Sequence, residues 1–336
     1  MKNAVLKVVC SALVCSTVIA CGGSSTPPPA QPDPSLQDTD DGAASDSSNS
    51  DAKVSPEQKQ AMDAIKAGDF AKASELLTSL RSKEPKNAEV AFYSGVAAEG
   101  LTNPGEAQKY YRQAMDLNPK LADAPANLSA LLINSEQYDA AMTVIQEGLK
   151  ASPDHDALLN NQAVALMGKG DAKGAAQVYD HLVSKNPQNE ELKVNEAEAW
   201  FAAGDKDRAL KIAGSLLHSD QRAVLASVAD LHARLGAFDP CVAALTRAIG
   251  LHDAAELHIS RGMCEHGLKQ EQKATDDFQK ATEMDSTSAV AFYYLGRSRA
   301  AAGLSARARE AFKKAAALDP NGKIGQAASK AAAELH

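Results

Sequence analysis

Two histidines and a cysteine in one segment have side chains that commonly bind transition metals. His258, Cys264 and His266 supply two imidazole rings and a thiol, a ligand set typical of zinc. On a helix, ligands for one ion stand about one turn apart, whereas these two histidines are about two turns apart. One ion can hardly contact both, so we predict no metal and no cofactor.

Motifs for enzymatic chemistry are missing from the sequence. It contains no G-x-x-x-x-G-K-[ST] phosphate loop, no G-x-S-x-G nucleophile elbow and no H-E-x-x-H zinc helix. The net charge of -8 and the lack of a basic cluster argue against nucleic acid, because phosphate binding requires grouped Lys and Arg. We predict that the protein is not an enzyme and has no nucleic-acid partner and no small-molecule substrate.

Residues 1–20 have the pattern of an export signal. Lys2 and Lys7 form a basic start, and an apolar stretch over 8–20 follows that is too short to span a bilayer stably. Residues 18–21 read Val-Ile-Ala-Cys, which resembles the lipobox of bacterial lipoproteins, where a peptidase cuts before a lipid-bearing cysteine. The alternative is an ordinary secretory signal with a chance cysteine.

The lipobox resemblance implies that Cys21 is the mature first residue and carries the lipid that attaches the chain to a membrane. Gly22 follows it in place of the Asp that often retains such proteins in the inner membrane. The expected location is therefore the cell envelope, at the outer membrane facing the periplasm.

Residues 21–53 contain mostly Ser, Pro, Gly and Asp, with almost nothing apolar to bury. Such a composition predicts a disordered spacer that spans roughly 30 Å on average. The alternative is that the proline-rich part, PPPAQPDP, is a ligand for a polyproline-binding domain.

The rest of the chain is periodic. Prolines recur every 34 residues at Pro85, Pro119, Pro153 and Pro187, and Pro320 has the same phase after two slightly shorter units. A period of this length predicts helical hairpin repeats. Eight units follow over residues 54–320, with starts at 54, 88, 122, 156, 190, 222, 255 and 289. Residues 321–336 are Ala-rich and predict a capping helix.

Small residues occupy two fixed positions of every unit, where two crossing helices require them. The eighth positions are Ala61, Gly95, Ser129, Ala163, Ala197, Ala229, Gly262 and Gly296, and the twentieth are Ala73, Ala107, Ala141, Ala175, Ala209, Cys241, Ala274 and Ala308. This pattern resembles the tetratricopeptide repeat. The resemblance implies an all-α, right-handed superhelical solenoid. Polar residues depart from the family pattern at Glu196, His232, Glu265 and Arg299.

The repeat phase brings two cysteines to adjacent helices. Cys241 begins the second helix of unit six, and Cys264 lies late in the first helix of unit seven. In an oxidising compartment they are a candidate disulfide. The alternative is two small buried residues that fill a helix interface.

The resemblance also implies a concave surface, lined by the first helices, that binds protein segments. By position its lining is Phe92, Val96, Glu99, Ile133, Asn134, Asn160, Val164, Met167, Val194, Glu198, Phe201, Asp230, Arg234, Ile259, Met263, Tyr293 and Arg297. Five of them predict a continuous exposed apolar strip, namely Phe92, Val96, Val164, Val194 and Phe201. If the phase were wrong by one position, these five would be core residues. The same phase predicts that Trp200 is buried.

These observations favour a membrane-anchored scaffold or assembly factor that binds protein partners in the bacterial envelope. The alternative is a regulatory lipoprotein that activates a cell-wall synthase or hydrolase. Only the identity of the partner separates the two, because both would use the same fold and the same surface.

Overall fold

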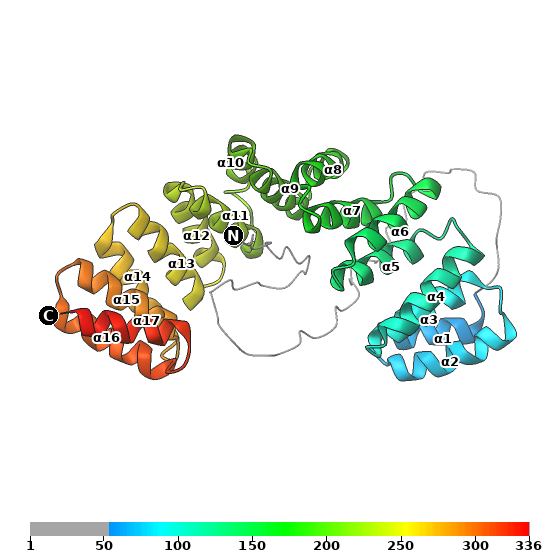
Figure 1. The fold of residues 1–336 in the computed structure, drawn as a ribbon, viewed down its shortest axis with the longest axis horizontal. Coiled ribbons are helices and arrows are strands. Elements are labelled where there is room, and N and C mark those ends of the chain that lie inside the picture. Colours follow the sequence, from blue (N-terminus) through cyan, green and yellow to red (C-terminus); the bar gives the residue numbers. More distant parts are fainter. Residues whose placement is uncertain (1–53, 336) are drawn as a thin grey trace. The chain divides into compact units, whose positions relative to one another are not determined.

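The computed structural model describes residues 54–335, and every helix or strand assigned in that range is an α-helix (Figure 1). The export signal, Cys21 and the spacer lie outside the described residues. The helices are α1 (Pro56–Lys66), α2 (Phe70–Lys83), α3 (Ala88–Gly100), α4 (Pro104–Leu117), α5 (Asp123–Asn134), α6 (Tyr138–Ala151), α7 (Asp156–Gly168), α8 (Ala172–Lys185), α9 (Glu190–Ala202), α10 (Lys206–Ser215), α11 (Arg222–Arg234), α12 (Phe238–Leu251), α13 (Ala255–Gly267), α14 (Glu271–Met284), α15 (Ala289–Ala301), α16 (Ser305–Leu318) and α17 (Lys323–Glu334).

The described chain divides into two compact units, 54–178 and 179–335, and the boundary falls within α8. In the first unit, α1 pairs with α2, α3 with α4 and α5 with α6. In the second, α9 pairs with α10, α11 with α12, α13 with α14 and α15 with α16, and α17 covers α15 and α16. The predicted all-helical repeat fold is therefore confirmed. None of the helices within 54–335 is long and apolar enough to cross a membrane.

Helix ends follow from local chemistry. Gly204 follows α9 with a φ of 87°, a left-handed conformation that only glycine adopts without strain. Asp205 then caps α10, because its Oδ1 accepts a hydrogen bond from the backbone N–H of Arg208 at 3.1 Å. The sequence pair Asp239-Pro240 suggests a helix entry of the same kind, but α12 begins two residues earlier, at Phe238. Proline is tolerated there because first-turn N–H groups have no partner within the helix.

The two small positions of each unit lie in the core. All sixteen residues are buried, and Trp200 is buried too, as predicted. Three of the eighth positions are glycine, and in each of these units an aromatic ring on the second helix packs against the glycine. A Cβ added to Gly262 would lie 2.8 Å from Phe278 Cε1, and Gly95 and Gly296 meet Tyr111 and Phe312 in the same way. The ring thus fills the space that the glycine leaves.

A second set of glycines and aromatic rings joins successive hairpins. In three hairpins the second helix begins with an aromatic residue, and its ring packs on the glycine that ends the first helix of the following hairpin. A Cβ on that glycine would not fit. The pairs are Phe70 with Gly100, Tyr138 with Gly168 and Phe238 with Gly267. Close approach of one hairpin to the next therefore requires glycine at these positions.

Candidate functional site

The three side chains with metal-binding chemistry do not form one site. Cys264 is joined to Cys241 by a disulfide, with the two Cα atoms 6.2 Å apart. His266 is exposed, and its Nδ1 lies 2.9 Å from Glu271 Oε2. His258 is buried and held by carboxylates. Among the residues that the structure describes, no group of three or more His, Cys, Asp or Glu side chains is placed to hold a metal ion.

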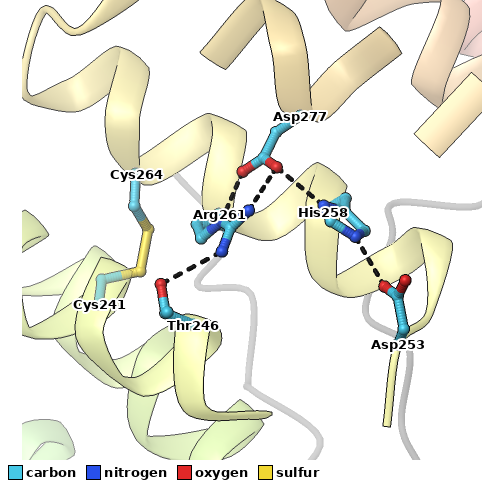
Figure 2. A network of polar contacts seen from close by, with 7 residues as sticks. All are labelled: Cys241, Thr246, Asp253, His258, Arg261, Cys264 and Asp277. Atoms are coloured by element: carbon cyan, nitrogen blue, oxygen red, sulfur yellow. Dashed lines mark hydrogen bonds and ion pairs between the residues drawn. A yellow bond between two sulfur atoms is a disulfide. The ribbon is translucent and has the colours of Figure 1, made fainter. Parts of the chain in front are cut away.

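His258 belongs to a polar network beside the disulfide (Figure 2). Its Nδ1 and Nε2 lie 2.8 Å from Asp277 Oδ1 and 2.7 Å from Asp253 Oδ1. Arg261, on the same helix α13, donates from Nε and Nη2 to the two carboxylate oxygens of Asp277, each at 2.7 Å. Its Nη1 donates to Thr246 Oγ1 of α12 at 3.3 Å. The network thus connects α12, α13, α14 and the α12–α13 loop.

This arrangement stabilises the fold and does not suit catalysis. Both ring nitrogens of His258 lie against carboxylate oxygens, so neither nitrogen is open to a substrate. Asp277 is buried; each of its oxygens accepts a hydrogen bond from Arg261, and Oδ1 also contacts His258. Such bidentate, charge-assisted contacts offset the cost of burying a carboxylate.

Two polar residues that depart from the repeat pattern, Glu265 and His232, are buried without full hydrogen bonding. Glu265 is 5% exposed, and its Oε2 has no hydrogen-bond partner in residues 54–335. Burial, and then the charge of Asp277, raise the pKa of Glu265 to about 7. His232 has no partner for either ring nitrogen in the same range, and burial lowers its pKa, which favours the neutral ring.

The predicted groove residues of the first unit are mostly half-buried. Phe92 packs against the ring of Tyr111, with the ring centroids 5.9 Å apart. Tyr111 Oη donates to Glu99 Oε2 at 2.8 Å and accepts from Asn127 Nδ2 at 3.4 Å. Burial raises the pKa of Glu99, and the hydrogen bond from Tyr111 opposes that rise. The half-buried residues are Phe92, Val96, Glu99, Ile133, Asn160 and Met167, and Asn134 is exposed.

The prediction that Val164 and Ile259 line an open surface is wrong, because both side chains are buried. Val164 is 7% exposed and Ile259 is 5% exposed. Ile259 belongs to one apolar cluster with Ala291 and Leu295 of α15, so the neighbouring first helix contributes to its burial. The five apolar groove residues therefore do not form the continuous exposed strip that was predicted. Phe92 and Val96 pack against the core of the first unit, and Val194 and Phe201 against that of the second.

Four predicted groove residues of the second unit form one cluster on α9 and α11. The guanidinium of Arg234 lies 4.8 Å from the ring centroid of Phe201. Arg234 also pairs with Glu198 and, at 2.8 Å, with Asp230. Burial raises the pKa of Glu198, while Arg234 acts to lower it. The cluster presents an aromatic ring with a cation on its face.

A pocket of about 130 Å³ lies farther along the second unit. Its lining is Met263, His266, Phe278, Tyr294, Arg297 and Ser298. Met263 and Arg297 were predicted groove residues, whereas Tyr294 and His266 were not. Met263 is 43% exposed, and Tyr294 stacks on Phe278 with the ring centroids 5.6 Å apart. The pocket is thus an apolar recess with a cation at its edge.

The repeats match established protein families. Family models described as tetratricopeptide repeat match residues 59–122, 98–163, 166–249 and 290–322. The Hsp70-Hsp90 organizing protein of Triticum aestivum is 30% identical over 36% of this chain and 21% of its own length. The tetratricopeptide repeat-containing protein trd-1 of Caenorhabditis elegans is 30% identical over 31% of this chain and 14% of its own length. The chain thus spans about a fifth or less of these relatives.

Solved structures show the same fold at low identity. A tetratricopeptide repeat protein from Parabacteroides merdae has a TM-score of 0.52 and 17% identity, covering 74% of this chain and 99% of its own. Yeast Tom70 has a TM-score of 0.50 and 14% identity, covering 86% of this chain and 65% of its own. Because the matched repeats cover more than half of the sequence and the helices pair as hairpins, the chain belongs to the tetratricopeptide repeat proteins.

Proposed function

We propose that the chain is a scaffold that holds a protein partner on the surface of its first helices and is tethered to the outer membrane of a bacterial envelope through a lipid on Cys21. Repeat solenoids bind through such extended surfaces. One relative carries an organising role for Hsp70 and Hsp90 in its name, which supports a protein-binding role. The lipobox pattern of residues 18–21 supports the tether.

The pocket beside Met263 is the observation that carries the binding proposal. Surface methionines adapt to differently shaped apolar groups, and an exposed one beside stacked aromatic rings favours insertion of an apolar partner side chain. Arg297 lies 5.8 Å from the Tyr294 ring centroid and extends the site with a positive charge. Arg234 and Phe201 form a second contact point on the same unit.

Crosslinking in intact cells tests this proposal with two methionine variants. Met263→Ala should lower the yield of crosslinked partner, because truncating a central anchor costs on the order of 1 to 3 kcal/mol of binding energy, or roughly 5- to 150-fold in affinity. Met284→Ala is the matched control, since Met284 is 39% exposed but does not line the pocket. Equal loss of partner in both variants, or none in Met263→Ala, would contradict the proposal. The partner identified then separates an assembly role from regulation of a wall enzyme.

A further inference from the structure

A larger pocket of about 410 Å³ lies in the second unit, lined by residues from the end of α8, from α9 and from α10. Its lining is Asp180, Val183, Lys193, Glu196, Trp200, Arg208, Lys211, Ile212 and Ser215. None of these is among the predicted groove residues. Helix α10 has 10 residues, whereas the second helices α12 and α14 have 14, so it ends at Ser215, on the pocket wall. The volume is in the range of pockets that enclose small ligands.

Positive charge exceeds negative charge in this pocket. Neither Lys193 nor Lys211 forms an ion pair within residues 54–335. Arg208 lies 4.3 Å from the Trp200 ring centroid and pairs with Asp205 at 3.1 Å. A local cationic site in a chain of net charge -8 is complementary to an anion.

The two acids of the pocket do not cancel this charge. Trp200 Nε1 donates to Asp180 Oδ1 at 2.9 Å, which stabilises that carboxylate. Burial raises the pKa of Glu196 to about 7, with a further rise from its hydrogen bond to Asp180 and the charge of Asp180, while Lys193 opposes the rise. Near neutral pH Glu196 is therefore partly protonated. Arg208 is balanced by Asp205, so Lys193 and Lys211 face the charge of Asp180 and only part of a charge on Glu196.

We propose that this pocket binds a carboxylate attached to a small apolar group, with the carboxylate between Lys193 and Lys211. Val183 and Ile212 supply the apolar walls, and Trp200 gives the site a rigid, mostly apolar side. The same chemistry is offered by an acidic side chain next to an aliphatic one in a protein segment and by a free organic acid. This site is separate from the pocket beside Met263, and the proposal does not depend on the scaffold function.

Trp200 is the only tryptophan of the chain, so its fluorescence reports on this pocket directly. The probes are the peptide acetyl-Glu-Leu-Glu-Leu-amide, the same peptide with Gln in place of Glu, and glutarate. We expect a saturable change of emission with the Glu peptide and at least a tenfold weaker response with the Gln peptide. Saturation by glutarate at similar concentration would indicate a free acid as the source, and saturation by the peptide alone a protein segment.

Charge reversal at one lysine completes the test. Lys211→Glu should weaken peptide binding at least tenfold, whereas Lys206→Glu, on the same helix but outside the lining, should leave it unchanged. Binding should be tighter at about pH 6 than at about pH 8, and Glu196→Gln should remove that difference. Thermal melts of each variant verify folding. Equal binding of the Glu and Gln peptides, or an unchanged response in folded Lys211→Glu, would overturn the proposal.

Discussion

Glu265 is a carboxyl group at a place where most other units have an apolar side chain. Its neighbours in the fold are the buried Asp277 and Arg261, whose charges act on it in opposite directions. Arg261 is already engaged by both oxygens of Asp277, so it offers Glu265 no hydrogen bond. Desolvation therefore dominates, and the protonated acid is the better-tolerated form in the folded chain.

Stability should consequently depend on pH through Glu265. Its folded pKa of about 7 is above the value of an unfolded chain, roughly 4.3. The folded state therefore binds the proton more tightly, and its advantage is lost as pH rises through about 7. Glu265→Gln should match the wild type near pH 4 and be more stable near pH 8 by on the order of 1 to 3 kcal/mol.

Urea unfolding midpoints at the two pH values measure this difference. Glu256→Gln is the control on the same helix. Because Glu256 is exposed, this substitution should change the urea midpoint by the same amount at both pH values. A constant difference between wild type and Glu265→Gln across the pH range would show that Glu265 is ionised alike in both states.

At the scale of elements, the disulfide holds α12 against α13. The two cysteines are 23 residues apart in sequence, and closing a loop of that size in the unfolded chain corresponds to about 3 kcal/mol in the chain-entropy account. The double variant Cys241→Ala with Cys264→Ala should lose roughly 2 to 4 kcal/mol of stability. Alanine is chosen because both positions are buried and a serine hydroxyl would need a partner.

The measurement is a pair of thermal melts with and without dithiothreitol. Reductant should lower the wild-type midpoint and leave that of the double variant unchanged. A reductant-insensitive wild type would mean that Cys241 and Cys264 are thiols in the isolated protein, and the stabilising role assigned to the disulfide would be wrong.

The helices and their repeat phase could be predicted from the sequence because the small positions recur at a fixed period. Contacts that depend on which residues face each other after the helices pack could not be predicted from the sequence. Asp253 and Asp277 reach His258 from a loop and from α14, and no local spacing indicates that pairing. Ile259 has the periodicity of a surface position but is covered by a neighbouring helix. The recurring aromatic–glycine pairs, such as Tyr138 with Gly168, stand 29 or 30 residues apart in the sequence, but that spacing alone does not show that the two residues touch.

At the scale of the whole molecule, partner binding and the lipid tether depend on different parts of the chain. Partner binding uses the helices within 54–335, whereas the tether uses Cys21, which lies outside the described residues. A fragment that starts at residue 54 should therefore retain the partner-binding surface of the full chain. Loss of membrane attachment and loss of partner binding can then be measured separately.

The tether is tested by the mass of the protein purified from membranes. Wild-type protein should be cut before Cys21 and carry acyl chains, since each buried methylene contributes about 0.8 kcal/mol and two or more chains anchor stably. Cys21→Ala should leave an uncut precursor without an acylated N-terminus. Cys10→Ala is the matched control, because Cys10 lies in the segment that is removed, so the mature mass should not change. Wild-type protein that is soluble and cut at another residue would exclude the lipid anchor while leaving the Met263 crosslinking result unaffected.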